Sequence, residues 1–369
     1  MAPPDVSAPD VIVTWLQNDY GQLGRPAESI AHALQDSGLA RQVAYIEPRI
    51  PTDGPPSLDI ESVRGVHRYV LRGAVAEPSE VAAAVTANSQ LRDPVLLNFG
   101  VDIPNWWFHH TFAPVASTTA LVTHDVLELW PGQDPARSAH LKQVRRLLVR
   151  SSDQVIGLST GSIDDVAGAV YVGHGCDPGM DDPAIDSLPE PPDLAAIPHP
   201  RALYFGALSY RIDVAAVAAL ADSGVHVVLV GFAPSPALAE LIQRHRRVHF
   251  LGARPPGASR PYLLHCDLGI VPHTDEPFTW TMEPHKVYNY SCAGVRSVLL
   301  NCTPPRDLAH LLGSARTVDG FVEACRAQLA NGRLTDGERD EARRHTWTSV
   351  AGRILTAVGH PVHETAGVS

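Results

Sequence analysis

Short apolar runs alternate with amphipathic segments along most of the chain. The apolar runs are brief and rich in valine, isoleucine and leucine, which favours buried strands. They predict strands at residues 11–16, 43–46, 66–71, 95–99, 120–122, 154–158, 170–172, 202–205, 225–230, 248–251, 268–271 and 298–300. Helical spacing predicts helices at residues 27–38, 138–149, 214–222, 237–244, 284–293, 321–329 and 336–358. Strands separated by helices are typical of parallel sheets with crossover helices.

The alternation is interrupted at residues 183–200, where prolines are dense. Such a composition is typical of a semi-rigid linker, and 369 residues are enough for two domains. The predicted α/β fold has two Rossmann-like domains facing across a cleft, and such sheets bind ligands at the carboxyl ends of their strands. We predict a first domain at 1–183, a linker at 184–200, a second domain at 201–340, and a C-terminal helix and tail at 341–369 packing back across the junction.

Composition and charge argue against several classes of protein. The net charge is −11 and no cluster of Lys and Arg stands out, which argues against nucleic-acid binding. No apolar stretch is long enough to span a membrane, and the N-terminus lacks the pattern of a signal peptide. The five cysteines form no C-x-x-C pair, which predicts free buried thiols. We therefore expect a soluble, cytoplasmic protein.

Residues 275–298 carry the clearest chemical signal. A polar loop follows the strand at 268–271, Pro284 opens a short helix, and Gly294 follows its end. Lys286 then lies in the first helical turn, where the helix dipole makes a cation unfavourable unless an anion is near. A strand, a loop and a helix with a lysine at its start are typical of a phosphate site. A solvated lysine is the alternative.

Four stretches of sequence occur in the order and spacing of one enzyme family. Residues 267–272 precede the pattern Thr281-x-x-Pro284-x-Lys286-x-x-x-Tyr290-x-x-Ala293-Gly294. Residues 121–125, 172–177 and 204–213 supply three weaker matches. Together they resemble GT-B glycosyltransferases, most closely a bacterial branch of the retaining type whose second domain carries "P-x-K-x-x-E-Y-x-A-x-G".

The resemblance implies a glycosyltransferase that moves a hexosyl or deoxysugar group from a nucleoside-diphosphate sugar to an acceptor, with retention and without a metal or other cofactor. The acceptor would be a small molecule, a glycan or a lipid-linked precursor, held by the first domain. Without a metal, cations and backbone N–H groups must stabilise the diphosphate leaving group. The implied catalytic residues are His124, Asp125, Arg211 and Lys286. The implied donor-binding residues are Gly21, Gly24, Arg25, Gly206, Thr281, Glu283, Pro284, His285 and Asn289.

Several of these residues have plainer interpretations. Gly21 and Gly24 also suit an ordinary turn, Arg211 also suits a surface pair with Asp213, and His124 also suits a core histidine bonded to backbone. The sequence departs from the family pattern at Asn289 and Thr281, where the resembled enzymes carry carboxylates. Glu283 and Glu276 are near enough in sequence to substitute.

Two other functions remain open on the sequence. A sugar-nucleotide epimerase has a similar architecture, and the missing carboxylates also suit a non-catalytic protein that binds sugar nucleotides. An aromatic segment at residues 104–112 would supply either core packing or an acceptor wall, with Trp106 and Trp107 on opposite sides if the segment is extended.

Overall fold

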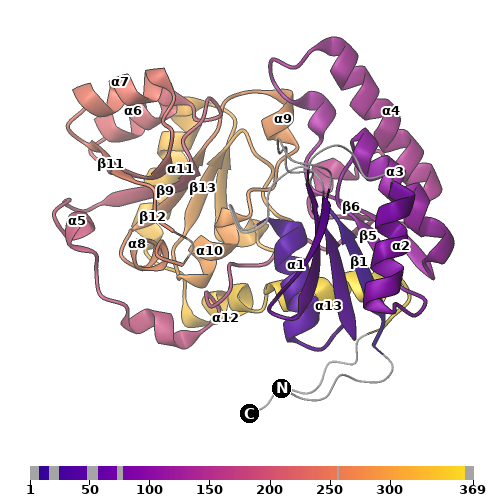
Figure 1. Ribbon diagram of the computed structural model, residues 1–369. Coiled ribbons are helices and arrows are strands. Elements are labelled where there is room, and N and C mark those ends of the chain that lie inside the picture. Colours follow the sequence, from indigo (N-terminus) through magenta and orange to yellow (C-terminus); the bar gives the residue numbers. More distant parts are fainter. Residues whose placement is uncertain (1–7, 16–24, 48–56, 73–77, 256, 362–369) are drawn as a thin grey trace. The chain divides into compact units, whose positions relative to one another are not determined.

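The computed structural model describes residues 8–15, 25–47, 57–72, 78–255 and 257–361 (Figure 1). The chain forms two compact units. The first unit combines Met1–Val172 with Trp347–Ser369, and the second is the continuous stretch Gly173–Thr346. The boundary after Val172 therefore comes before the proline-rich segment expected as a linker.

The first unit is built on an eight-stranded sheet in the order β3-β4-β2-β1-β5-β6-β7-β8. The pair β3 and β4 is antiparallel, and the other neighbours are parallel. Its strands are β1 (Asp10–Thr14), β2 (Gln42–Ile46), β3 (Ser57–Val63), β4 (Val66–Arg72), β5 (Val95–Asn98), β6 (Thr118–Thr123), β7 (Gln154–Gly157) and β8 (Val170–Tyr171). Its helices are α1 (Pro26–Asp36), α2 (Pro78–Ser89), α3 (Ile103–Phe112), α4 (Pro135–Ser151) and α13 (Trp347–Ala357).

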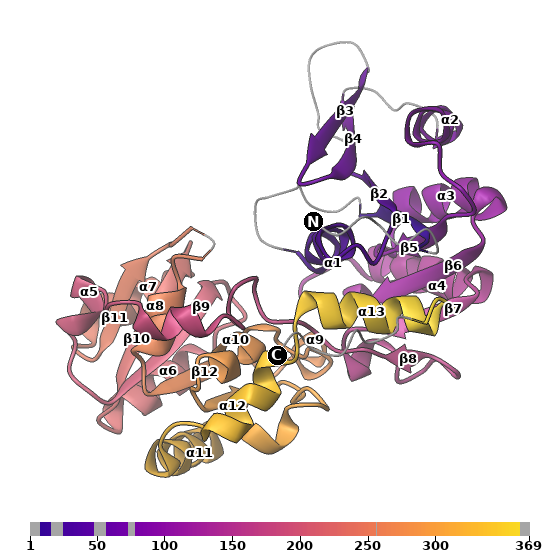
Figure 2. The same ribbon diagram turned by 90° about the horizontal axis from the view of Figure 1, so that it is seen from below.

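Helices cover both faces of this sheet. Every residue of β1 is buried, as expected for a parallel strand with helices on each side. Val11 and Val13 face a core shared with α1 and α13, whereas Ile12 faces a core shared with α2 and α3. Figure 2 shows α13 lying beside α1. The C-terminal helix thus completes the first unit.

The second unit is built on a six-stranded parallel sheet in the order β11-β10-β9-β12-β13-β14. Its strands are β9 (Arg201–Ala207), β10 (His226–Phe232), β11 (Val248–Gly252), β12 (Leu268–Pro272), β13 (Ser297–Leu300) and β14 (Leu312–Ala315). Its helices are α5 (Pro192–Ala195), α6 (Val214–Asp222), α7 (Pro236–Arg244), α8 (Arg260–Leu264), α9 (Pro277–Trp280), α10 (Lys286–Cys292), α11 (Val318–Asn331) and α12 (Asp336–Arg343). Short 3₁₀ helices occur in the two units at Ala113–Val115, Leu127–Leu129, Thr160–Ser162, Pro183–Ser187 and Ala309–Leu311.

Two cores flank this second sheet. Residues of α6, α7 and α11 pack on one face, and residues of α8, α10 and α12 pack on the other. The proline-rich segment contributes Ile185, Leu194 and Ile197 to the second of these cores. Apolar residues between the prolines thus anchor this segment to the second unit.

The stretches at which the chain enters and leaves the second unit lie side by side. The backbone N–H of Cys176 donates to the carbonyl of His345 at 2.7 Å, and Cys176 pairs with Thr346 in a parallel bridge. This pairing coincides with a break in the predicted helix at 336–358, which is two helices, α12 and α13, separated by residues 344–346. A capping box formed by Thr335 and Glu338 begins α12.

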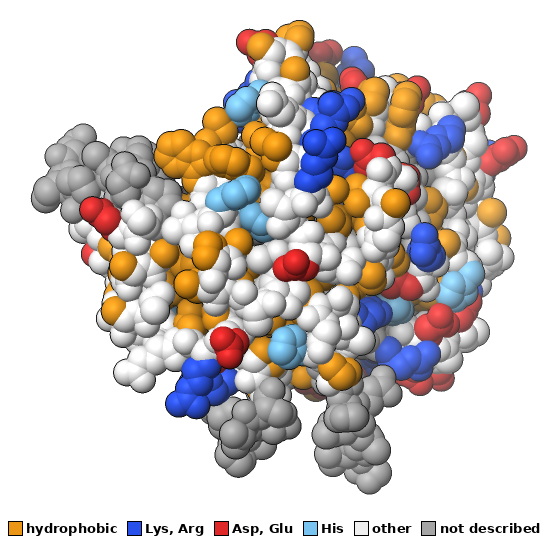
Figure 3. Space-filling model, turned by 90° about the vertical axis from the view of Figure 1, so that its right-hand side faces the viewer, with side chains coloured by type: hydrophobic (Ala, Val, Ile, Leu, Met, Phe, Trp, Pro, Cys, Tyr) orange, Lys and Arg blue, Asp and Glu red, His pale blue; other side chains and the backbone are white. Residues whose placement is uncertain are grey.

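The aromatic segment at 104–112 is a helix, not an extended strand. The Asp102 carboxylate accepts from the backbone N–H of Asn105 at 3.0 Å and caps α3, a contact that stabilises a helix by about 1 kcal/mol. Phe108 and Phe112 enter the core, whereas Ile103 and Trp107 are exposed. Figure 3, which faces the side of α2, α3 and α4, shows hydrophobic side chains (orange) gathered beside Lys and Arg.

Within the described residues, no helix combines the length and apolar character needed to cross a membrane.

Candidate functional site

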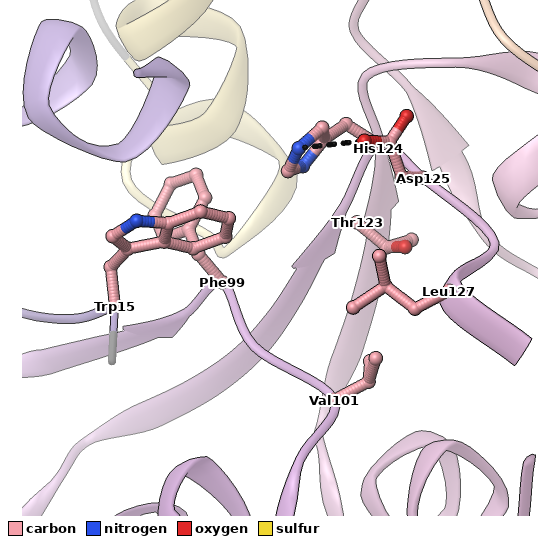
Figure 4. A pocket seen from close by; sticks show the side chains of 7 residues that line it. All are labelled: Trp15, Phe99, Val101, Thr123, His124, Asp125 and Leu127. Carbon is pink, nitrogen blue, oxygen red and sulfur yellow. Dashed lines mark ion pairs between the residues drawn. The ribbon is translucent and has the colours of Figure 1, made fainter. Parts of the chain in front are cut away.

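In the first unit, the predicted residues meet where β6 ends. His124 and Asp125 directly follow Thr123, and His124 Nε2 lies 3.5 Å from Asp125 Oδ2. The Ser159 hydroxyl, just beyond β7, donates to the His124 carbonyl at 2.7 Å and fixes the backbone. The Trp15 ring lies 5.5 Å from the His124 ring. Trp15, Thr123, His124 and Asp125 are among the residues that line a small hollow partly open to solvent (Figure 4).

The electrostatics of this hollow are mixed. Burial is the main cause that lowers the pKa of His124, Arg25 lowers it further, and the Asp125 carboxylate opposes both. Arg25 occupies the position just before α1, close enough to act on His124. The structure therefore brings Arg25, His124 and Asp125 together. Gly21 and Gly24 lie outside the described residues.

In the second unit, Lys286 is the first residue of α10, so the helix begins two residues later than predicted. Its ammonium nitrogen lies 4.1 Å from the centre of the Tyr204 ring, a cation–π contact from β9. Among the described residues, no carboxylate lies within ion-pair distance of Lys286 Nζ. The lysine is half-buried, so its charge is held at the carboxyl ends of the strands without a fixed counter-ion.

Two glycines open space beside this lysine. Gly206 has a φ of +127°, and a Cβ there would lie 3.5 Å from Lys286 Nζ. Gly231 is its partner in β10, and a Cβ at Gly231 would lie 1.8 Å from the Gly206 carbonyl oxygen. Side chains are therefore excluded here, and the backbone of β9 stays accessible beside the cation, as anion sites require.

Arg211 is the second cation of this region. Its carbonyl accepts from the N–H of Thr274 at 2.9 Å, and Ile212 pairs with His273 in an antiparallel bridge. Asp213, the alternative partner of Arg211 on the sequence, accepts from the N–H of Ala216 at 2.9 Å and caps α6. Lys286 and Arg211 both lower the pKa of His273, so both positive charges act electrostatically at the end of β12.

The loop between α9 and α10 carries four predicted donor-binding residues. Thr281 ends α9, and its hydroxyl donates to the Phe278 carbonyl at 2.8 Å. Glu283 and Pro284 are buried, and His285 immediately precedes α10. These residues shape the segment that delivers Lys286, and their contact with a donor stays a prediction.

Asn289 is engaged within the protein. Its side-chain oxygen accepts from the N–H of Asp177 at 2.7 Å, and its side-chain nitrogen donates to Asp177 Oδ2 at 2.8 Å. The residue is fully buried. This amide therefore fastens α10 to the start of the unit, and a glutamate here would place a second carboxylate against Asp177.

Sequence reasoning missed Tyr204, Gly231 and His273. Only His273 had a local signal, since it lies two residues after the predicted strand at 268–271, as His124 lies two residues after 120–122. Tyr204 and Gly231 reach the site through strand register, which the sequence does not reveal. Among the described residues, no group of three or more His, Cys, Asp or Glu side chains is arranged to hold a metal ion.

Comparison with solved structures identifies the architecture. The chain is similar to sucrose-phosphate synthase from Thermosynechococcus elongatus, with a TM-score of 0.67 and 16% identity, covering 94% of this chain and 98% of that chain. An α,α-trehalose-phosphate synthase (UDP-forming) from Burkholderia xenovorans, in complex with glucose-6-phosphate, gives a TM-score of 0.66 and 10% identity over 95% and 100% of the two chains. The chain has the GT-B fold.

A third GT-B structure, Anabaena HepE in complex with UDP and glucose, gives a TM-score of 0.60 and 15% identity, covering 94% of this chain and 96% of that chain. No model of a protein family and no curated protein matches the sequence. The likeness therefore lies in the order and packing of the elements, which extends over nearly the whole chain.

Proposed function

We propose that the protein is a glycosyltransferase that uses a nucleoside-diphosphate sugar, with retention at the transferred sugar and without a metal ion. The observation that carries the proposal is the pair of cations, Lys286 and Arg211, which both act on His273 at the carboxyl end of β12, with Lys286 also beside Gly206 of β9. The UDP-containing and UDP-forming proteins of similar fold support a nucleoside diphosphate as the ligand.

The chemistry follows from where charge develops. The bond between the anomeric carbon and the diphosphate oxygen breaks, and its electron pair stays on the diphosphate. The acceptor hydroxyl oxygen forms the new bond to the anomeric carbon, and its proton passes to the departing diphosphate. Cations held in place before the reaction stabilise the leaving group without reorganising, which is worth about 3 to 4 kcal/mol for one such group. Lys286 and Arg211 fill this role in the proposal, and His124 with Asp125 contacts sugar hydroxyls in the first unit.

The first test asks whether the protein binds a nucleoside diphosphate. UDP, GDP and dTDP are compared by thermal unfolding, because a ligand at 100 times its Kd stabilises the folded state by about 2.7 kcal/mol. We expect one of the three to raise the Tm clearly. If none of them does, the donor assignment fails.

The second test locates the binding site. The chain contains two lysines, Lys286 and the exposed Lys142 of α4. A lysine-selective acylating reagent followed by peptide mass spectrometry should show that the bound diphosphate protects Lys286 and leaves Lys142 reactive. Equal modification rates at Lys286 with and without the diphosphate would remove this lysine from the site.

A non-catalytic sugar-nucleotide-binding protein is the second candidate. The observation that favours it is Asn289, whose two polar atoms are both bonded to Asp177 where the resembled enzymes carry a glutamate. Incubation with the bound sugar nucleotide and a panel of hydroxylated acceptors decides between them, because only a transferase releases the diphosphate. NMR of the donor incubated alone would reveal an epimerase by inversion of a sugar centre.

A further inference from the structure

The backbone of His273 is held in place just beyond the carboxyl end of β12. Its carbonyl accepts from Asn301 Nδ2 at 3.1 Å, and its N–H donates to the Val271 carbonyl at 3.1 Å. Together with the bridge to Ile212, these contacts fix the backbone from both sides. The residue is 2% exposed, so its ring is taken out of water.

The two ring nitrogens of His273 differ in their surroundings. Nδ1 lies 3.2 Å from the Cys302 sulfur, just beyond β13. Nε2 is buried and has no hydrogen-bond partner among the described residues. An unsatisfied buried polar group costs about 1 to 3 kcal/mol, so a nitrogen left in this state indicates a partner that is not part of the protein.

Chemistry selects the tautomer of this ring. Burial, and then Lys286 and Arg211, hold the pKa of His273 well below its ordinary value, so the ring is neutral. Burial raises the pKa of the Cys302 thiol to about 12, so it keeps its proton and can donate it. When the thiol donates to Nδ1, the ring proton resides on Nε2.

The neighbourhood of the ring suits an anion. Lys286 and Arg211 are the charges that act on it, and the Tyr204 ring that contacts Lys286 lies 6.4 Å from the imidazole. A neutral N–H donor beside two cations can bind a phosphate oxygen, which only accepts hydrogen bonds. It does so without adding a third positive charge beside Lys286 and Arg211.

We propose that His273 Nε2–H donates a hydrogen bond to a phosphate oxygen of the bound nucleoside diphosphate, and that Cys302 positions it by holding the Nε2–H tautomer. This inference rests on the proposed function. It adds a phosphate-binding residue and a positioning thiol, and neither of them belongs to the set predicted from the sequence.

The decisive experiment compares three substitutions by titration calorimetry with the nucleoside diphosphate that wild type binds and with the matching nucleoside. His273→Gln places an amide N–H near the Nε2 position, whereas His273→Asn places one near Nδ1, and His273→Ala removes both. We expect the Ala and Asn variants to lose about tenfold or more in diphosphate affinity, because a charge-assisted hydrogen bond is lost. The Gln variant should stay within about threefold of wild type, and nucleoside affinity should not change.

The proposed role of the Cys302 thiol is tested by measuring which ring nitrogen of His273 carries the proton. Nitrogen-15 NMR of histidine-labelled protein, with the His273 signals assigned by their loss in His273→Gln, should show the proton on Nε2 in wild type and in Cys302→Ser, which keeps a donor. Cys302→Ala should shift the His273 signals toward the other tautomer and weaken diphosphate binding. This spectral readout does not depend on how well His273→Ala and His273→Asn fold.

The possible failures are distinct. If wild type binds the diphosphate and His273→Ala binds it equally well, or if wild type carries the proton on Nδ1, the inference about His273 is overturned and the proposed function stands. If wild type binds no nucleoside diphosphate and acylation of Lys286 is unprotected, the proposed function itself fails.

Discussion

The two units place a histidine at the same kind of position and surround it with different chemistry. His124 follows β6 in the first unit, has the Asp125 carboxylate 3.5 Å away and is also acted on by the Arg25 cation. His273 follows β12 in the second unit, with a thiol on one ring nitrogen and two cations acting on it. Burial is the main cause that lowers the pKa of both rings. Under the proposed function, this contrast assigns the diphosphate to the second unit and the uncharged hydroxyl groups of the sugar or acceptor to the first.

The largest expected effect comes from removing Lys286, one of the two cations at the second-unit histidine. Lys286→Met should lower diphosphate affinity and turnover by about 100-fold or more, because one preorganised positive charge is lost. Calorimetry and initial rates measure both effects. Lys142→Met replaces the other lysine, which is exposed on α4, and should match wild type. Similar losses in the two variants would show that Lys286 acts only through general charge.

Crowding the cation without removing it should have the next largest effect. Gly206→Ala forces an alanine to a φ of +127° and sets a methyl group near Lys286 Nζ, so diphosphate affinity should fall about tenfold. Gly224→Ala is the matched control, since it has a φ of +101° with no atom near its Cβ. That control should lose stability and keep its affinity. Urea unfolding and calorimetry separate the two results, and an equal loss of affinity would contradict the site.

Substitution in the first unit should affect transfer and spare diphosphate binding. His124→Ala should lower the transfer rate about tenfold, the scale of one lost hydrogen bond to the sugar or acceptor, with diphosphate affinity unchanged. His110→Ala removes an exposed histidine of α3 and serves as the control. A fall in diphosphate affinity in His124→Ala would remove the division of roles between the units.

The smallest effect concerns stability at acid pH. The pKa of each strand-end histidine is below its ordinary value of 6.5 in the folded protein, and that of His273 is well below it. The unfolded chain therefore takes up more protons as pH falls below 6.5, and folding stability declines, by at most about 1.4 kcal/mol per pH unit for one group. Urea unfolding at pH 7 and 5.5 should show a smaller decline in His273→Gln than in wild type. His124→Gln should reduce this decline in stability by a smaller amount than His273→Gln does. A larger reduction in His124→Gln than in His273→Gln would contradict the difference in burial between the two rings.

Much of the fold could be predicted from the sequence because most strands are short apolar runs. The strands missed were β3, whose exposed residues include Glu61, and β14, whose sequence Leu-Gly-Ser-Ala is only weakly apolar. The break between α12 and α13 was also missed, and it coincides with a backbone pairing to Cys176, which is far away in sequence. Hydrophobic periodicity reports only on residues near one another in sequence, so it cannot predict such long-range backbone pairing.

The candidate site was predictable only for residues that come soon after a predicted strand or at the start of a predicted helix. His124, Arg211 and Lys286 follow strands or open a helix, so the sequence could place them. The pairing of Asn289 with Asp177 joins residues 112 positions apart. Only the structure shows that Asp177 is hydrogen-bonded to both the oxygen and the nitrogen of the Asn289 side chain. Cys302 gave no signal at all, because its partner nitrogen lies on a neighbouring strand.

The adjacent entry and exit of the second unit have a practical consequence. Because Cys176 is bonded to His345 and pairs with Thr346, residues 173–346 begin and end at neighbouring points. A continuous segment with its ends together is the arrangement that tolerates excision and transplantation. One stretch of gene could therefore be exchanged for that of another GT-B protein while the host unit, including its C-terminal helix, is left intact. Under the proposed function, such an exchange would test whether the second unit sets the nucleotide preference.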